Sequence, residues 1–102
     1  MSVENFKYVI RRQLCNVARY EGISREHRGA WIETQMENVE DKTLENILGD
    51  TKFTQLLNNL TADVFEDYYT DLCHWIAVFH RATNYILEEE SIQDLKNMFM
   101  KL

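Results

Sequence analysis

A row of carboxylates is the first group of residues in this sequence whose type and spacing could do chemistry. Asp63, Asp67 and Asp71 recur every four residues, and Glu66 stands beside them. Residues four apart lie on one side of a helix, so these side chains would form a continuous acidic face. Such a face can dock onto a basic surface or imitate a phosphate backbone. The alternative is a solvated helix start, where negative charge suits the helix dipole.

Basic residues gather instead near the N-terminus. Residues 1–28 hold six basic and three acidic side chains, whereas residues 29–102 hold five basic and fourteen acidic ones, and the net charge is −6. Tyr8, Arg12, Cys15 and Arg19 recur at helical spacing and predict a second, mostly polar face on the first helix. Cys15 is the more plausible reactive thiol of the chain, because neighbouring cations stabilise a thiolate.

The segment VARYEGIS, residues 17–24, places the small residue Ala18 four positions before Gly22. It resembles the turn of a helix-turn-helix DNA-binding motif, although Glu21 and Arg28 stand where that motif has buried apolar residues. The resemblance implies that nearby basic side chains meet phosphates or bases. These candidates are Arg12, Arg19, Arg25, His27 and Arg28. A plain helix–glycine–helix junction with solvated arginines is the alternative.

Spacings typical of catalytic or metal sites are not found. Asp71 and His74 are three apart on a helix, but no second element of this kind could complete a metal site with them. Cys73 is adjacent to His74, and neighbours on a helix point about 100° apart. Cys73 also lies in the most apolar stretch, which predicts an inert core thiol. We therefore expect no catalytic residues, no metal and no cofactor.

The elements that must position all these residues are helices, because the chain has no proline and only three glycines. Between Leu72 and Phe79, apolar residues cover almost the whole circumference of a helix, which is typical of a helix surrounded by others. This stretch predicts a long central helix over about residues 62–87, capped by Thr61. Three further predicted helices have a cap before their first residue: Ser2 for the helix from Val3 to just before Gly22, Asp41 for Lys42 to Leu48, and Asp50 for the helix that ends at about Leu60. The remaining two run from Arg25 to Glu37 and from Ser91 to the chain end.

The fold class that follows is all-α, a compact domain of five to six helices over residues 1–102. The N-terminus lacks the pattern of a signal peptide, and the longest apolar run, Trp75–Phe79, is far too short to span a bilayer. Two distant cysteines favour a reduced, cytoplasmic protein.

The function that we expect is that of a small non-enzymatic regulator or inhibitor that binds another macromolecule. The acidic row, with Tyr68 beside it, would cover a basic site on a partner protein. The alternative is a helix-turn-helix regulator of nucleic acid, acting as a homodimer through the basic N-terminal region.

Overall fold

Helix α1 begins the structure and supplies much of its core. The computed structural model describes residues 1–61 and 68–88, and α1 spans Val3–Tyr20. Ser2 caps its start as predicted, because the Asn5 amide donates to Ser2 Oγ over 3.1 Å. Apolar side chains at three- and four-residue steps bury one face of the helix. The buried residues of α1 are Phe6, Val9, Ile10, Gln13, Leu14, Val17 and Ala18.

Gly22 ends α1, as its position in the sequence predicts. Its φ of 72° lies in the left-handed region, which glycine adopts without a steric penalty. The Ile23 amide donates to the Ala18 carbonyl over 3.0 Å, and the Gly22 amide donates to the Arg19 carbonyl over 3.1 Å. This pair of bonds is the Schellman motif, which satisfies the last carbonyls of a helix and reverses the chain.

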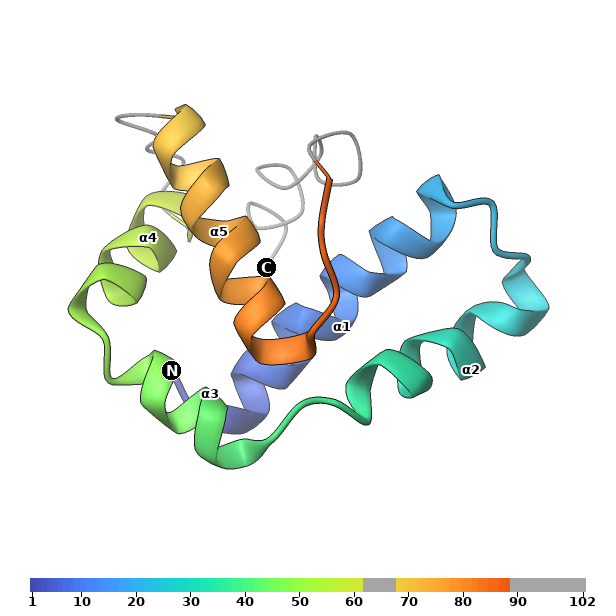
Figure 1. The fold of residues 1–102 in the computed structure, drawn as a ribbon, viewed down its shortest axis with the longest axis horizontal. Helices are drawn as coiled ribbons and strands as arrows, with labels where there is room; N and C mark the ends of the chain where they lie inside the picture. The colour runs from blue at the N-terminus through green and yellow to red at the C-terminus, as the bar shows by residue number, and fades with distance from the viewer. Residues whose placement is uncertain (62–67, 89–102) are drawn as a thin grey trace.

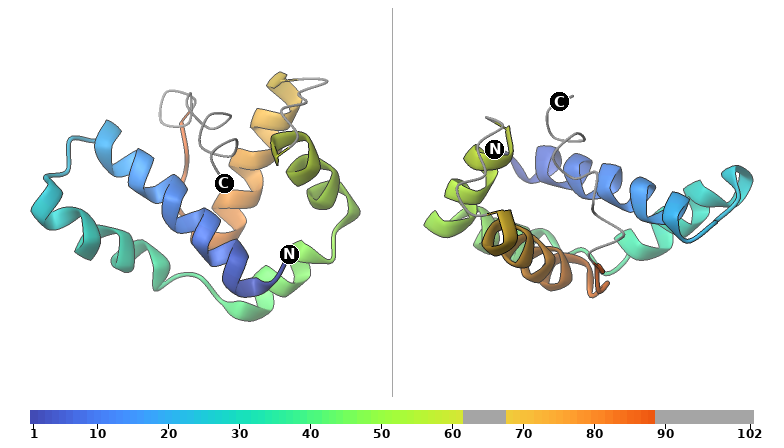
Figure 2. Two further views of the ribbon diagram at one scale, coloured as in Figure 1. Left: turned by 180° about the vertical axis from the view of Figure 1, so that it is seen from behind. Right: turned by 90° about the horizontal axis from the view of Figure 1, so that it is seen from above.

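Helix α2, Arg25–Met36, runs back alongside α1, as the views from the front and from behind both show (Figures 1 and 2). Its bounds agree with the prediction to within one residue. It buries only Met36 fully, while Trp31 and Ile32 are half-buried against the core. α2 is therefore a thin cover over α1, with most of its surface in solvent.

Helices α3, Asp41–Leu48, and α4, Thr51–Thr61, follow in short succession. Asp50 caps α4 as predicted, accepting at Oδ1 from the Lys52 amide over 2.9 Å. Asp41 is the first residue of α3 rather than its cap, and Thr61 lies in α4, while the start of the helix that it was predicted to cap lies outside the described residues. Phe53 of α4 stacks on Phe6 of α1, with ring centroids 4.9 Å apart.

Helix α5, Tyr68–Thr83, is the described part of the predicted central helix and crosses α1 in a separate layer (Figures 1 and 2). Other parts of the protein do not surround α5 on all sides, so the prediction of a helix buried around its whole circumference is wrong. Cys73, expected to be a core thiol, is exposed. The buried residues have the spacing of a single helical face, so neighbours cover α5 from one side only. These are Leu72, Trp75, Val78, Phe79, Ala82 and Thr83, and the exposed ones are Thr70, Cys73, Ala77, His80 and Arg81.

The helix also ends four residues before the predicted end at residue 87. Asn84 has a φ of 61°, a left-handed conformation that asparagine tolerates better than most residues. Thr83 Oγ1 donates to the Phe79 carbonyl over 2.8 Å and accepts from the Tyr85 amide over 3.1 Å. The chain therefore turns back, and Leu87 enters the core. The predicted start at residue 62 and the predicted last helix over residues 91–102 lie outside the described residues.

The five helices confirm the predicted all-α class, and the described residues contain no strand. A radius of gyration of 13.0 Å equals the value of about 13 Å expected for a compact chain of this length. No described helix is both long and apolar enough to cross a membrane.

Candidate functional site

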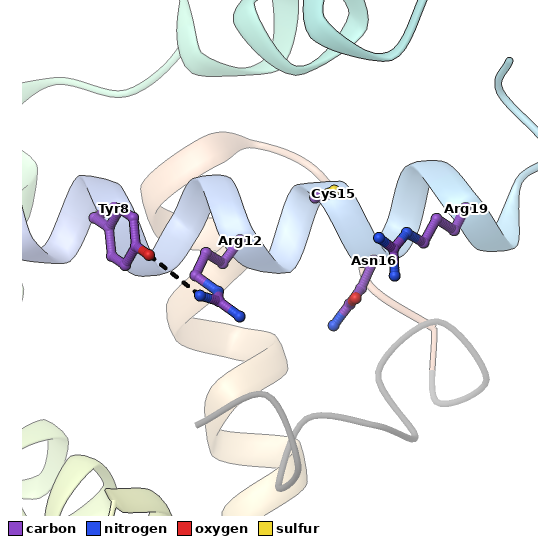
Figure 3. A pocket seen from close by; sticks show the side chains of 5 residues that line it. All are labelled: Tyr8, Arg12, Cys15, Asn16 and Arg19. Carbon is purple, nitrogen blue, oxygen red and sulfur yellow. Dashed lines mark hydrogen bonds between the residues drawn. The ribbon is translucent and has the colours of Figure 1, made fainter. Parts of the chain in front are cut away.

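The outer face of α1 carries a hollow of about 280 Å³. Five residues line this hollow. Four of them were predicted to share a polar face of the first helix, and that prediction is confirmed. The fifth, Asn16, was not part of the prediction. Asn16 lies four residues after Arg12 and three before Arg19, so helical spacing alone could have included it. The residues that line the hollow are Tyr8, Arg12, Cys15, Asn16 and Arg19 (Figure 3). We call this surface the α1 outer face.

Tyr8 and Arg12 form one end of the α1 outer face. Arg12 Nη1 donates to Tyr8 Oη over 3.2 Å, and the Arg12 guanidinium carbon lies 5.8 Å from the Tyr8 ring centroid. The tyrosine oxygen accepts this bond, so its own O–H remains available to a further acceptor. Tyr8 is 52% exposed and is one of the large hydrophobic residues at the surface of the described chain. Aromatic and arginine side chains together are typical of binding hot spots.

The positive charges of α1 are neutralised on one edge of the helix. Lys7 Nζ lies 2.7 Å from Asp41 Oδ1 of α3, and Arg11 Nε lies 3.2 Å from Glu33 Oε1 of α2. The hydrogen bond to Asp41 raises the pKa of Lys7 above its usual value. These pairs are exposed and each contributes little to stability, but they cancel charge locally.

Arg12 and Arg19 differ from Lys7 and Arg11, because neither forms an ion pair with a carboxylate in the described part of the chain. Arg12 is half-buried and Arg19 is exposed. Seven residues separate them, which is about 10 Å along the helix axis and nearly the same direction around it. The α1 outer face is thus a local positive surface on a chain whose net charge is −6.

The basic residues around the turn between α1 and α2 make local contacts instead. Arg28 Nη2 donates to the Ile23 carbonyl over 3.1 Å, so this side chain braces the turn. His27 Nδ1 lies 2.6 Å from Ser24 Oγ. Arg25 is exposed. A helix-turn-helix holds its two helices at roughly a right angle, whereas α2 runs back alongside α1 (Figure 1).

Glu21, which departs from the helix-turn-helix pattern, has a structural role that the sequence did not suggest. Its carboxylate accepts a hydrogen bond from the Tyr85 hydroxyl, 64 residues later in the chain. The Tyr85 ring meets Trp31 edge to face, with centroids 5.7 Å apart. Burial, and then the bond to Glu21, raise the pKa of Tyr85. Tyr85 thereby joins the end of α5 to the α1–α2 turn and to α2.

Of the predicted acidic row, only Asp71 can be placed with its side chain. It is half-buried, and Oδ2 is shielded from solvent with no hydrogen-bond partner among the described residues. Its carboxylate is therefore not simply a solvated charge at the surface. Asp63, Glu66 and Asp67 lie outside the described residues, and Tyr68 is described only as the first residue of α5.

The described residues contain no group of three or more metal-ligating side chains that could hold an ion. Ser24 and His27 are the nearest arrangement to a nucleophile and its base, and their three-residue spacing at a helix start could have been noticed in the sequence. Both are exposed, and neither residue has a further side-chain partner in the described residues that would orient the imidazole as a catalytic base requires. The pair is an ordinary contact at a helix N-terminus.

Comparison with known proteins gives no family for this chain. No model of a known protein family, no curated protein and no solved structure matches it.

Proposed function

We propose that this protein is a small non-enzymatic regulator that acts by binding another protein and covering part of its surface. The observation that carries the proposal is the α1 outer face. Arg12 and Arg19 lie there without carboxylate partners among the described residues, while Lys7 and Arg11 on the same helix are paired. Exposed ion pairs contribute little to the stability of a monomer, so the fold has little need to pair these arginines, whereas a binding surface gains from them electrostatic complementarity to its partner.

The acidic row from Asp63 to Asp71 is a second surface for such a partner, in this case a basic one. The half-buried position of Asp71 gives this surface less support than the α1 outer face has. A nucleic-acid partner has less support too, because Arg28 and His27 make local contacts at the turn. Cys15 and Cys73 are both free thiols, which suits a protein of the cytoplasm.

Affinity capture with charge variants tests the proposal. The full chain, its Arg12→Glu/Arg19→Glu variant and an Asp63→Lys/Asp67→Lys/Asp71→Lys variant serve as baits in lysate, with and without nuclease. The matched control is Lys42→Glu/Lys52→Glu, which makes the same charge change at two exposed lysines in the first turns of α3 and α4. Negative charge is favourable at those positions, so this control should keep the fold.

We expect a stoichiometric protein partner that survives nuclease, is lost with the arginine variant and is kept by the control. If only the aspartate variant fails to capture the partner, the partner contacts the acidic row and not the α1 outer face. Partners that disappear with nuclease would contradict protein binding and would favour the helix-turn-helix alternative, including its dimer.

A further inference from the structure

We infer that the α1 outer face takes an acidic peptide segment, whose carboxylates pair with Arg12 and Arg19. This inference rests on the proposed function, because it names the chemistry of the partner at the same surface. The hollow of about 280 Å³ has room for the side chains of a short segment. Three properties of the hollow carry the inference: its excess of donors, the separation of its two charges, and the small number of free cations around it.

The first property is the excess of hydrogen-bond donors. Two guanidinium groups, the Tyr8 hydroxyl and the Asn16 amide contribute N–H and O–H groups, and no carboxylate of residues 1–61 or 68–88 lines the hollow. The described contacts use a single Arg12 N–H, and the Tyr8 oxygen accepts it. A carboxylate, which is only an acceptor and carries a negative charge, satisfies such a surface in charge and in hydrogen bonding.

The second property is the separation of the two charges. Figure 3 shows the Arg12 guanidinium beside Tyr8, and the Arg19 side chain directed back along α1 so that its guanidinium lies next to Asn16. Arg12 and Arg19 leave the helix about two turns apart, a span that suits a ligand with more than one carboxylate better than a single small anion. An extended peptide advances about 3.3 Å per residue, so a few residues carry carboxylates to both arginines. The ligand is therefore a segment with more than one acidic residue.

The third property separates a peptide from a nucleic acid. A nucleic-acid binder that makes about six to ten phosphate contacts needs a comparable number of cations. On α1, Lys7 and Arg11 already have carboxylate partners, which leaves Arg12 and Arg19. Two arginines without a carboxylate partner among the described residues, with a tyrosine beside them, suit a short acidic segment, which needs few contacts and can place an apolar side chain against the ring.

Cys15 provides a reporter inside the hollow. A Cys73→Ser variant removes the exposed thiol and leaves Cys15 alone. Its reaction with the uncharged reagent 4,4′-dithiodipyridine is followed by absorbance, with and without acetylated octaglutamate amide as the probe. With the peptide at ten times its Kd, we expect the Cys15 rate to fall by about tenfold, because the bound form is covered. Octaglutamine should give no protection, and added salt should weaken the effect of octaglutamate.

Two variants in the Cys73→Ser background test the assignment to the arginines. Arg12→Gln/Arg19→Gln should abolish protection, while Lys42→Gln/Lys52→Gln, with the same change of charge, should retain it. Circular dichroism and thermal unfolding show that each variant is folded. Protection that survives the arginine variant would overturn the inference, as would the absence of both protection and binding in the parent.

Other occupants give different outcomes, and each would overturn the inference. Protection by inorganic phosphate at the same concentration would mean a site for a single oxyanion. Binding of a DNA duplex through the same arginines, without binding of octaglutamate, would mean a nucleic-acid surface. A Glu88→Gln/Glu89→Gln/Glu90→Gln variant is compared with the parent in the absence of peptide. A faster reaction of Cys15 in this variant would mean that carboxylates of this chain occupy the hollow.

The outcome also separates this inference from the proposed function. A captured protein partner that depends on Arg12 and Arg19, with no binding of octaglutamate, would support the proposed function. It would contradict the inference that the α1 outer face takes an acidic segment. Octaglutamate protection without any captured protein partner would support the site and contradict the proposed regulator.

Discussion

At the residue scale, Gln13 is the most unusual member of the core. Its side chain is completely buried in α1, and neither its amide nitrogen nor its oxygen has a hydrogen-bond partner in the described part of the chain. An unsatisfied buried amide costs about 1–3 kcal/mol. We expect Gln13→Met, which keeps the length of the side chain, to raise the free energy of unfolding by about 1 kcal/mol.

Urea denaturation measures this change, with Gln55→Met as the matched control at an exposed position of α4. The control should alter stability by no more than about 0.5 kcal/mol. A destabilised Gln13→Met variant would show that the buried amide is satisfied in solution, for example by an internal water.

Tyr85 gives the second prediction at this scale. Its hydroxyl donates to Glu21, and both burial and this bond raise its pKa above the usual value of about 10. The protonated hydroxyl is therefore favoured in the folded protein, and its contribution is complete below about pH 10 and is lost as the pH rises further. We expect Tyr85→Phe to cost about 1 kcal/mol at neutral pH.

Urea denaturation of the parent and of Tyr85→Phe between pH 7 and a pH above 10 checks this dependence. The difference in stability should be constant at first and should shrink above about pH 10. Glu21→Gln should weaken the bond, so the double variant with Tyr85→Phe should cost less than the two single costs added together. Additive costs would show that the two side chains act independently.

At the element scale, α2 is the described helix that buries the fewest residues. It buries one residue fully and carries Gly29 in its middle, where an added Cβ would meet no atom within 4 Å. Glycine inside a helix costs about 0.5–1 kcal/mol relative to alanine. We therefore expect Gly29→Ala to stabilise the protein by about that amount.

Gly22→Ala is the matched comparison, since it makes the same chemical change where φ is 72°. A Cβ in the left-handed region costs about 1–2 kcal/mol, so this variant should be destabilised although space is free around it. Thermal unfolding of both variants tests whether Gly29→Ala raises the stability and Gly22→Ala lowers it. A loss of stability with Gly29→Ala would mean that the exposed face of α2 is covered in solution.

The same elements show what the sequence could predict. The bounds of α1 and α2 and the polar face that lines the hollow followed from local signals: the Ser2 cap, the Gly22 stop and helical spacing. The exposed stripe of α5 did not, because Cys73 and Ala77 are small and apolar, and hydrophobicity alone cannot tell whether such residues face the core or solvent. The early end of α5 depends on Asn84, whose left-handed conformation competes with helix continuation and leaves no clear mark in the sequence.

The contacts that define the candidate surface were the least predictable. Helical spacing brought Arg12 and Arg19 together, but nothing in the sequence pairs Arg11 with Glu33 or Lys7 with Asp41. These partners are set by how α2 and α3 pack on α1. The same packing leaves Arg12 and Arg19 unpaired among the described residues, so the distinction between neutralised and free cations exists only in the folded molecule.

At the scale of the whole molecule, the net charge of −6 opposes the approach of an acidic partner, while the α1 outer face attracts it once contact is made. Long-range repulsion acts on the association rate, and contacts within the hollow act on the dissociation rate. Neutralising distant carboxylates should therefore accelerate association without changing dissociation. Three suitable residues are exposed at the end of α2 and on or just before α3: Glu37, Glu40 and Glu45.

Glu37→Gln/Glu40→Gln/Glu45→Gln changes the net charge from −6 to −3. Stopped-flow fluorescence with labelled octaglutamate should give an association rate about two- to fivefold higher at low ionic strength, with an unchanged dissociation rate. The gain should vanish near 1 M salt, where the screening length is about 3 Å. A changed dissociation rate would place these carboxylates in contact with the bound peptide, and would mean that the ligand extends from the α1 outer face onto α2 and α3.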